Sequence, residues 1–148
     1  MSNTLMGYYE RETVRVTSEG ELNILLDAVV ALPHPTWLQL ESPSHEVLMI
    51  GLGQDFSSLR FIEGLNAGDE MYHSVGTLAD PAEAEFDMGS VPTKMDVGSA
   101  IPAAHARAAA AEFLRTSQRP ASVAWTVVPM PEGEPDPVEG WGAFADPK

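Results

Sequence analysis

The side chains best suited to metal binding or general-base chemistry in this sequence are its four histidines. They are His34, His45, His73 and His105. Zinc enzymes hold their metal with histidines at a short fixed spacing, as in HExxH, or with a histidine and a CxxC pair. No histidine here has such a spacing, and the chain contains no cysteine. We therefore predict no metal site, no cofactor and no cysteine nucleophile.

Glycines and serines near the middle of the chain are the next candidates for chemistry. Gly51 and Gly53 begin like a dinucleotide-binding loop, but Phe56 occupies the place of the third glycine and no helical pattern follows. Ser57 and Ser58 do not lie in a GxSxG nucleophile motif. The glycines are more typical of a strand end or bulge. We predict no catalytic residue and no enzyme, with an active site built from distant residues as the alternative.

Acidic residues dominate the charge of the chain. Eight Lys and Arg residues stand against 22 Asp and Glu residues, for a net charge of -14. Such a field repels nucleic acid and anionic membranes and attracts basic proteins. We therefore predict a basic protein as the partner, with no direct contact to nucleic acid or to a membrane. The alternative is a surface whose charges only keep the protein soluble.

The densest acidic stretch without a helix or strand pattern lies between Glu63 and Asp96. Part of it flanks a predicted turn, and from Gly76 to Gly98 it is predicted as a long loop, with short strands near Phe86 and Val91. Long ordered loops in compact domains are often functional, although charge runs are usually solvated. The predicted partner-binding carboxylates are Glu63, Asp69, Glu70, Asp80, Glu83, Glu85 and Asp87.

Two predicted helices and several short strands have to position this stretch. A strand is predicted from Tyr8 to Val16. Ser18 and Glu21 form a capping box before a helix that ends at Pro33, and a second, alanine-rich helix is predicted from Pro102 to Arg115. The predicted inward residues are Leu22, Leu25, Leu26, Val29 and Val30 in the first helix and Ala106, Ala109, Ala110, Phe113 and Leu114 in the second.

Short apolar runs separated by tight polar turns predict antiparallel strands between the helices. The runs are 37–41, 46–50, 59–62 and 71–75, and a last strand carries Val123, Trp125 and Val127. The predicted fold is therefore α+β, an antiparallel β-meander sheet packed by two main helices. Trp37, Phe113 and Trp125 are its predicted structural core anchors.

The length of 148 residues fits one domain. We predict a single α+β domain over residues 1–128, followed over 129–148 by an acidic, Pro-rich tail that is extended or folded back. Trp141 in this tail is a further candidate for partner contact. The amino terminus carries no export signal and no apolar run reaches the length of a membrane span, so we predict a cytoplasmic protein.

A recognisable pattern runs through the second helix and beyond it. It consists of 101–106, 111–116, 118–120 and 123–125, preceded by 48–53, 57–59 and 72–76. Over roughly residues 35 to 128, the chain resembles immunity protein family one of bacterial polymorphic toxin systems. Members of that family often carry glycine where Ser117 stands, at a position where a left-handed residue would cap the helix.

The resemblance implies that the protein is an antitoxin. Members of the family neutralise toxins encoded beside them, chiefly nucleic-acid deaminases, and would do so by binding and blocking the cognate toxin. A toxin that handles polynucleotides needs a basic cleft, which acidic loops can occupy as phosphate mimics. The alternative is an acidic protein-binding or scaffold domain for another basic partner, with no toxin involved.

Overall fold

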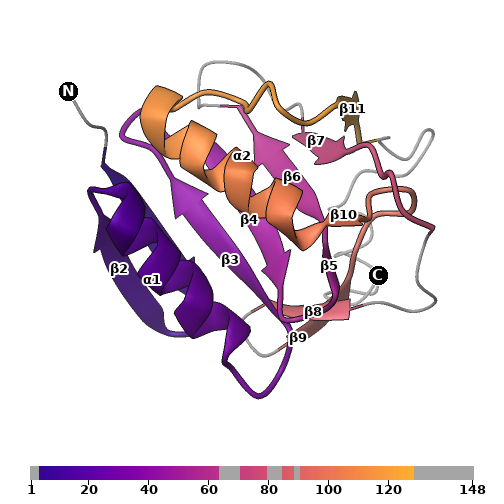
Figure 1. Cartoon of the computed structure of the whole chain (residues 1–148), viewed down its shortest axis with the longest axis horizontal. Coiled ribbons are helices and arrows are strands. Elements are labelled where there is room, and N and C mark those ends of the chain that lie inside the picture. The colour runs from indigo at the N-terminus through magenta and orange to yellow at the C-terminus, as the bar shows by residue number, and fades with distance from the viewer. Residues whose placement is uncertain (1–3, 64–70, 80–84, 89–90, 129–148) are drawn as a thin grey trace, which may run out of the picture.

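The computed structural model describes residues 4–63, 71–79, 85–88 and 91–128. Two helices, α1 (Glu19–Val30) and α2 (Ala103–Thr116), cover one face of a sheet (Figure 1). The main strands of this sheet run in the order β11-β7-β6-β4-β3-β1-β2, antiparallel throughout. They are β1 (Leu5–Tyr9), β2 (Glu12–Val16), β3 (Thr36–Glu41), β4 (Val47–Leu52), β6 (Leu59–Ile62), β7 (Met71–Ser74) and β11 (Trp125–Val127). The predicted α+β class is confirmed.

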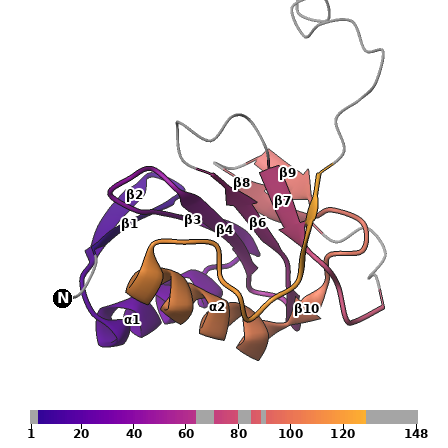
Figure 2. The ribbon, with the colours of Figure 1, turned by 90° about the horizontal axis from the view of Figure 1, so that it is seen from above.

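Four further strands lie outside this order. They are β5 (Phe56–Ser57), β8 (Glu85–Met88), β9 (Val91–Lys94) and β10 (Ile101–Pro102). β5 and β10 pair with each other, whereas β8 and β9 form an antiparallel hairpin that joins β3 through a parallel bridge between Thr36 and Asp87. Figure 2 shows this hairpin on the face of the sheet opposite the helices.

The strand predicted from Tyr8 to Val16 is wrong as a single element, because the segment is the hairpin of β1 and β2. Tyr9 pairs with Glu12, so Glu10 and Arg11 form a turn of two residues. Glu10 has a φ of 51°, in the left-handed region that tight hairpin turns require. Glycine or asparagine usually marks such a turn, and neither occurs here, so the sequence contained no turn signal.

The capping box predicted for α1 is confirmed, except that the Glu21 side chain binds the N–H of Thr17 and not that of Ser18. The Ser18 side chain accepts a hydrogen bond from the Glu21 N–H at 3.1 Å. The Glu21 carboxylate accepts one in turn from the Thr17 N–H at 2.7 Å, which lowers the pKa of Glu21. The predicted inward residues Leu22, Leu25, Leu26 and Val29 are buried. Val30 is 45 % exposed, because it lies about 100° around the helix from Val29 and only one of them can face the sheet.

The second helix buries the predicted side chains but begins one residue later than predicted. Pro102 is its N-cap in extended conformation, and Ala103 is the first helical residue. The buried positions are Ala106, Ala109, Ala110, Phe113 and Leu114. At its end Ser117 is left-handed, with a φ of 57°, and its N–H donates to the Phe113 carbonyl at 2.8 Å. The structure therefore places Ser117 in the conformation that a capping glycine would adopt.

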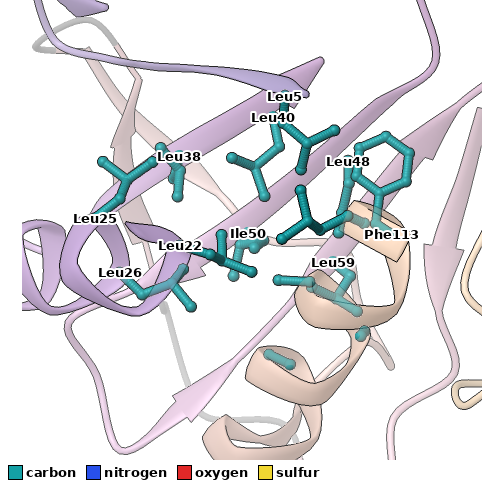
Figure 3. Close-up of a cluster of buried hydrophobic side chains, with 14 of the residues drawn as sticks. Leu5, Leu22, Leu25, Leu26, Leu38, Leu40, Leu48, Ile50, Leu59 and Phe113 are labelled. Carbon is teal, nitrogen blue, oxygen red and sulfur yellow. The ribbon is translucent and has the colours of Figure 1, made fainter. Parts of the chain in front are cut away.

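The main core lies between the helices and the sheet. Side chains alternate along β3 and β4, so Leu38 and Leu48 face α1 and α2 and are fully buried (Figure 3). Phe61 of β6 meets Phe113 of α2 edge to face, with ring centroids 5.8 Å apart. Each large side chain buried in this way contributes about 1.5–3 kcal/mol, and this layer supplies most of the apolar burial.

A smaller core occupies the opposite face of the sheet. Trp37 of β3 and Met49 of β4 pack there against Phe86 of β8, and the rings of Trp37 and Phe86 lie 5.2 Å apart. The hairpin can approach so closely because Gly51 has no side chain, since a Cβ atom there would lie 2.7 Å from the Phe86 ring. Gly51 therefore provides the space for Phe86, while Gly53, with a φ of 103°, has the strand-end torsion predicted for these glycines.

The three predicted core anchors differ in burial. Phe113 and Trp37 are buried, but Trp125 is only half-buried. The Trp125 ring packs 6.1 Å from Phe61, and its indole N–H donates to the Pro120 carbonyl at 2.7 Å. The proposed tail, 129–148, lies outside the described residues, so the division of the chain at residue 128 stays a prediction.

We predict that Ser117→Gly stabilises the protein by about 0.5–1 kcal/mol. A non-glycine residue in the left-handed region costs about 1–2 kcal/mol, and the greater entropy of glycine in the unfolded chain removes part of that gain. Chemical denaturation measures the difference. Ser117→Ala is the control, since alanine keeps the unfavourable torsion, and an equal gain in both variants would contradict this explanation.

Candidate partner-binding surface

Glu63, at the start of the predicted acidic stretch, takes part in an ion pair within the fold. Its carboxylate lies 3.5 Å from the Arg119 guanidinium, and that guanidinium lies 4.1 Å from the centroid of the Tyr72 ring. Both charged side chains are about one third exposed. Exposed ion pairs of this kind contribute little to stability. Glu63 is partly exposed and therefore accessible to a partner, with the Arg119 guanidinium beside it.

Glu85 and Asp87 lie on β8, which is the short strand predicted near Phe86 within the acidic loop. Phe86 between them is buried, and the alternation of a strand places both carboxylates on its other face. Glu85 is exposed and lies opposite Lys94 of β9, and Asp87 is half-buried. The other predicted contact residues, Asp69, Glu70, Asp80, Glu83 and Trp141, lie outside the described residues.

Asp96, at the far end of the acidic stretch, is a structural anchor. Its two carboxylate oxygens accept hydrogen bonds from Nε and Nη2 of Arg60, at 2.8 and 2.7 Å, although the residues are 36 positions apart. The hydrogen bonds that Arg60 donates to Asp96 raise the pKa of Arg60, against the effect of burial. Such a bidentate ion pair fixes both side chains and attaches the segment after β9 to the sheet.

Buried serines attach the same segment a second time. The Ser58 and Ser99 hydroxyls are hydrogen-bonded at 2.6 Å, and the Ser74 hydroxyl donates to the Ser99 carbonyl at 2.8 Å. The Gly76 N–H donates to the Gly98 carbonyl at 2.6 Å. The segment 76–98, which forms the second part of the acidic stretch, is therefore held at both its ends beside β6 and β7. Ser58 serves this anchorage, which explains its presence without a nucleophilic role.

A hollow of about 130 Å³ opens on the face of the sheet opposite the helices. Along one edge, β3 pairs with two different strands. It pairs with β1 at Gln39 and with β8 at Thr36. The hollow lies where these two neighbours diverge, and its lining includes Tyr8, Glu10, Trp37, Gln39, Met49 and Met88. Aromatic rings beside a carboxylate and an amide are residue types that bind cationic groups.

A second, more polar hollow of about 380 Å³ lies beyond the end of α2, lined by Glu46, Glu63, Gln118 and Arg119. The turn that follows Arg119 is held by Glu112 of α2. The Glu112 carboxylate accepts hydrogen bonds from the N–H groups of Ala121 at 2.7 Å and Ser122 at 3.1 Å. Burial opposes ionisation of Glu112, but these hydrogen bonds outweigh it and lower the pKa of Glu112.

The histidines do not form a common site. His34, His45 and His105 are exposed, and His45 lies 2.8 Å from the Glu41 carboxylate. His73 is buried on β7, with its Nδ1 atom 2.7 Å from the Ser74 carbonyl oxygen. Within residues 4–63, 71–79, 85–88 and 91–128, no group of three or more His, Cys, Asp or Glu side chains could hold a metal ion.

The fold and the surface together define an acidic α+β domain with helices on one face of its sheet and a carboxylate-bearing hairpin on the other. No helix in the described part of the chain is both long and apolar enough to cross a membrane. Residues 10–127 match the family described as immunity protein Imm1, and the chain belongs to this family of immunity proteins against toxins. The resemblance over residues 35 to 128 is thereby confirmed. No curated protein sequence matches the chain significantly.

Sequence reasoning missed the hollow beside Glu10 and Trp37. Its lining comes from β1, β3, β4 and β8, and only the sheet order brings these strands together. One signal was present, because Tyr8 and Tyr9 followed by two charged residues form an aromatic run that ends in a turn. The ion pairs of Glu63 with Arg119 and of Asp96 with Arg60 were also missed, because each arginine is distant from its carboxylate in the sequence.

We predict that Glu112 stabilises the fold in a pH-dependent manner. Its pKa is lowered on folding from about 4.5, so its contribution is present above about pH 4.5 and is lost as the pH falls through the folded-state pKa. The free energy of unfolding of Glu112→Gln should therefore be lower than that of the wild type at pH 7, with the difference shrinking towards pH 3. Denaturant titrations across this range measure it, and a constant difference would contradict the assignment.

Proposed function

We propose that this immunity protein binds and blocks a nucleic-acid-modifying toxin, most specifically a deaminase, in the cytoplasm. The observation that carries the proposal is the acidic excess of a family member whose net charge is -14. Arg60, Arg107 and Arg119 already lie against carboxylates of their own fold. Because 22 Asp and Glu residues stand against eight Lys and Arg residues, the protein presents a negative field to its partner.

The deaminase assignment rests on the chemistry that the partner must perform. An enzyme that deaminates a base in a polynucleotide has to hold the phosphate backbone, and it does so with Lys and Arg side chains. A protein with carboxylates on a rigid sheet can occupy such a cleft and compete with the phosphates. The resemblance to an immunity family whose members chiefly oppose deaminases supports the same choice.

The proposed inhibition requires binding alone. Membership in an immunity family supports a non-enzymatic inhibitor, and the described residues contain no assembled metal-ligand set. The predicted contact residues that the structure describes are Glu63, Glu85 and Asp87, and they remain our proposed contacts together with Asp69, Glu70, Asp80, Glu83 and Trp141. An acidic partner surface also favours fast association, because opposite charges steer the two proteins together.

The decisive experiment uses the toxin domain encoded beside this protein. Purified toxin is assayed for release of ammonia from single-stranded and double-stranded DNA and from RNA, with and without one equivalent of this protein. We expect complete inhibition at equal concentrations. Tight binding to a partner that deaminates none of these substrates would reject the deaminase assignment and favour a domain for another basic partner.

We predict a strong salt dependence of association with the toxin. Steered protein pairs associate at about 10⁸–10⁹ M⁻¹s⁻¹ at low salt, against about 10⁵–10⁶ M⁻¹s⁻¹ for pairs without steering. The association rate should fall by at least about tenfold between 10 mM and 500 mM NaCl, because salt screens exposed charges. Stopped-flow fluorescence measures it, and a rate that stays constant would reject steering while leaving binding intact.

We predict that neutralising the proposed loop and hairpin carboxylates speeds release of the toxin. The variant changes Asp80, Glu83, Glu85 and Asp87 to Asn or Gln, and we expect the dissociation rate to rise by about tenfold or more, which corresponds to about 1.4 kcal/mol. The matched control neutralises the exposed carboxylates Glu12, Glu19, Asp27 and Asp55. Equal effects of the two variants would show that only net charge matters.

A further inference from the structure

The hollow between β1, β3 and β8 has features that the packing of the fold does not require. Glu10 lines it from the β1–β2 turn, at a φ of 51° that glycine adopts without strain. A glutamate at this torsion is less stable than a glycine would be. Strained residues cluster at ligand-binding and active sites, although Ser117 has a similar torsion in this fold as a helix cap. The carboxylate is therefore the part of Glu10 that needs an explanation.

Trp37 adds an independent observation on the floor of the same hollow. It is only 4 % exposed, and its indole N–H has no hydrogen-bond partner among the residues that the structure describes. A buried polar group without a partner is unfavourable by about as much as a lost hydrogen bond, so such groups are rare in folded proteins. The N–H group is itself closed to solvent, so an oxygen of a bound partner reaches it only if the side chains around it move.

The remaining lining fits a flat cation. The rings of Tyr8 and Trp37, the Gln39 amide and the Met49 and Met88 side chains come from four strands. Aromatic faces attract guanidinium groups, and a neighbouring carboxylate binds them through paired hydrogen bonds. Lysine makes only a point-charge contact and does not stack in the same way. A volume of about 130 Å³ suits the end of one side chain and not a whole helix or strand.

We infer that this hollow is a socket for one arginine side chain of the toxin. The guanidinium stacks on the aromatic lining and pairs with Glu10. The inference rests on the proposed function for the identity of the partner, and the net charge of -14 favours a basic segment as the occupant. Met88, 39 % exposed on the hairpin, supplies an apolar rim beside the socket.

The socket is tested first without any toxin, in protein labelled with ¹⁵N. The indole signal of Trp37 is assigned with the variants Trp125→Phe and Trp141→Phe, and the peptide acetyl-Gly-Arg-Gly-amide is titrated in at millimolar concentration. We expect a saturable shift of the Trp37 signal, a weaker one with the lysine peptide and none with the citrulline peptide. An unmoved Trp37 signal, or an equal shift with citrulline, would overturn the inference.

The second test uses the toxin and separates stability from binding. Glu10→Gly should raise the melting temperature, because glycine accepts the turn torsion, and should speed dissociation from the toxin by about tenfold or more. Glu10→Gln keeps the strain and should also speed dissociation. The control Glu12→Gln removes an exposed charge two residues away and should leave the dissociation rate within about twofold.

The outcomes distinguish the socket from the proposed function. If the wild type inhibits the toxin and both Glu10 variants release it at the wild-type rate, the socket is wrong and the function stands. If the wild type does not bind the toxin at all, the proposed function fails. The arginine peptide titration then still decides whether the hollow binds a guanidinium group.

Discussion

The contact between Phe86 and Gly51 determines how the outer face of this sheet is organised. Helices α1 and α2 cover one face of the sheet, but the apolar side chains of Trp37 and Met49 lie on the other face. Phe86 covers them, and it does so because Gly51 offers no Cβ atom in its path. Holding Phe86 in place also holds β8, so the hairpin and its carboxylates acquire a defined position from a purely apolar contact.

The acidic stretch is attached to the sheet by polar contacts as well. Arg60 and Asp96 form one anchor, and the hydroxyls of Ser58, Ser74 and Ser99 form another. Together with the hydrogen bond from the Gly76 N–H to the Gly98 carbonyl, these contacts hold the described ends of the segment 76–98 beside β6 and β7. The carboxylate of Asp96 is already hydrogen-bonded to Arg60. An acidic residue in the sequence is therefore not automatically available to bind a partner.

The regular elements could be predicted because their signals are local. The Ser18 cap of α1, the alanine-rich face of α2 and the alternating strands all follow from residues within a few positions of one another. The β1–β2 turn at Glu10 could not be predicted, because it lacks the glycine that a left-handed torsion favours. The short strand near Phe86 was predicted, but the contact of Phe86 with Gly51 and the ion pair of Asp96 with Arg60 were not, because these partners are more than thirty positions away. The half-buried state of Trp125 depends on the short, terminal β11, which periodicity does not reveal.

Two kinds of carboxylate serve different steps of the proposed recognition. Exposed carboxylates that stay at the rim of the contact act at a distance, so they change the rate of encounter and are weakened by salt. Glu10 lies at a hollow with aromatic walls, where a bound cation loses water and the interaction is correspondingly stronger. Affinity among related complexes is governed mainly by the dissociation rate, which is slowed by carboxylates that lose water in direct contact with the partner. A fold that keeps a strained glutamate at a hollow lined by aromatic rings has therefore placed its proposed specific contact where the long-range field alone would be insufficient.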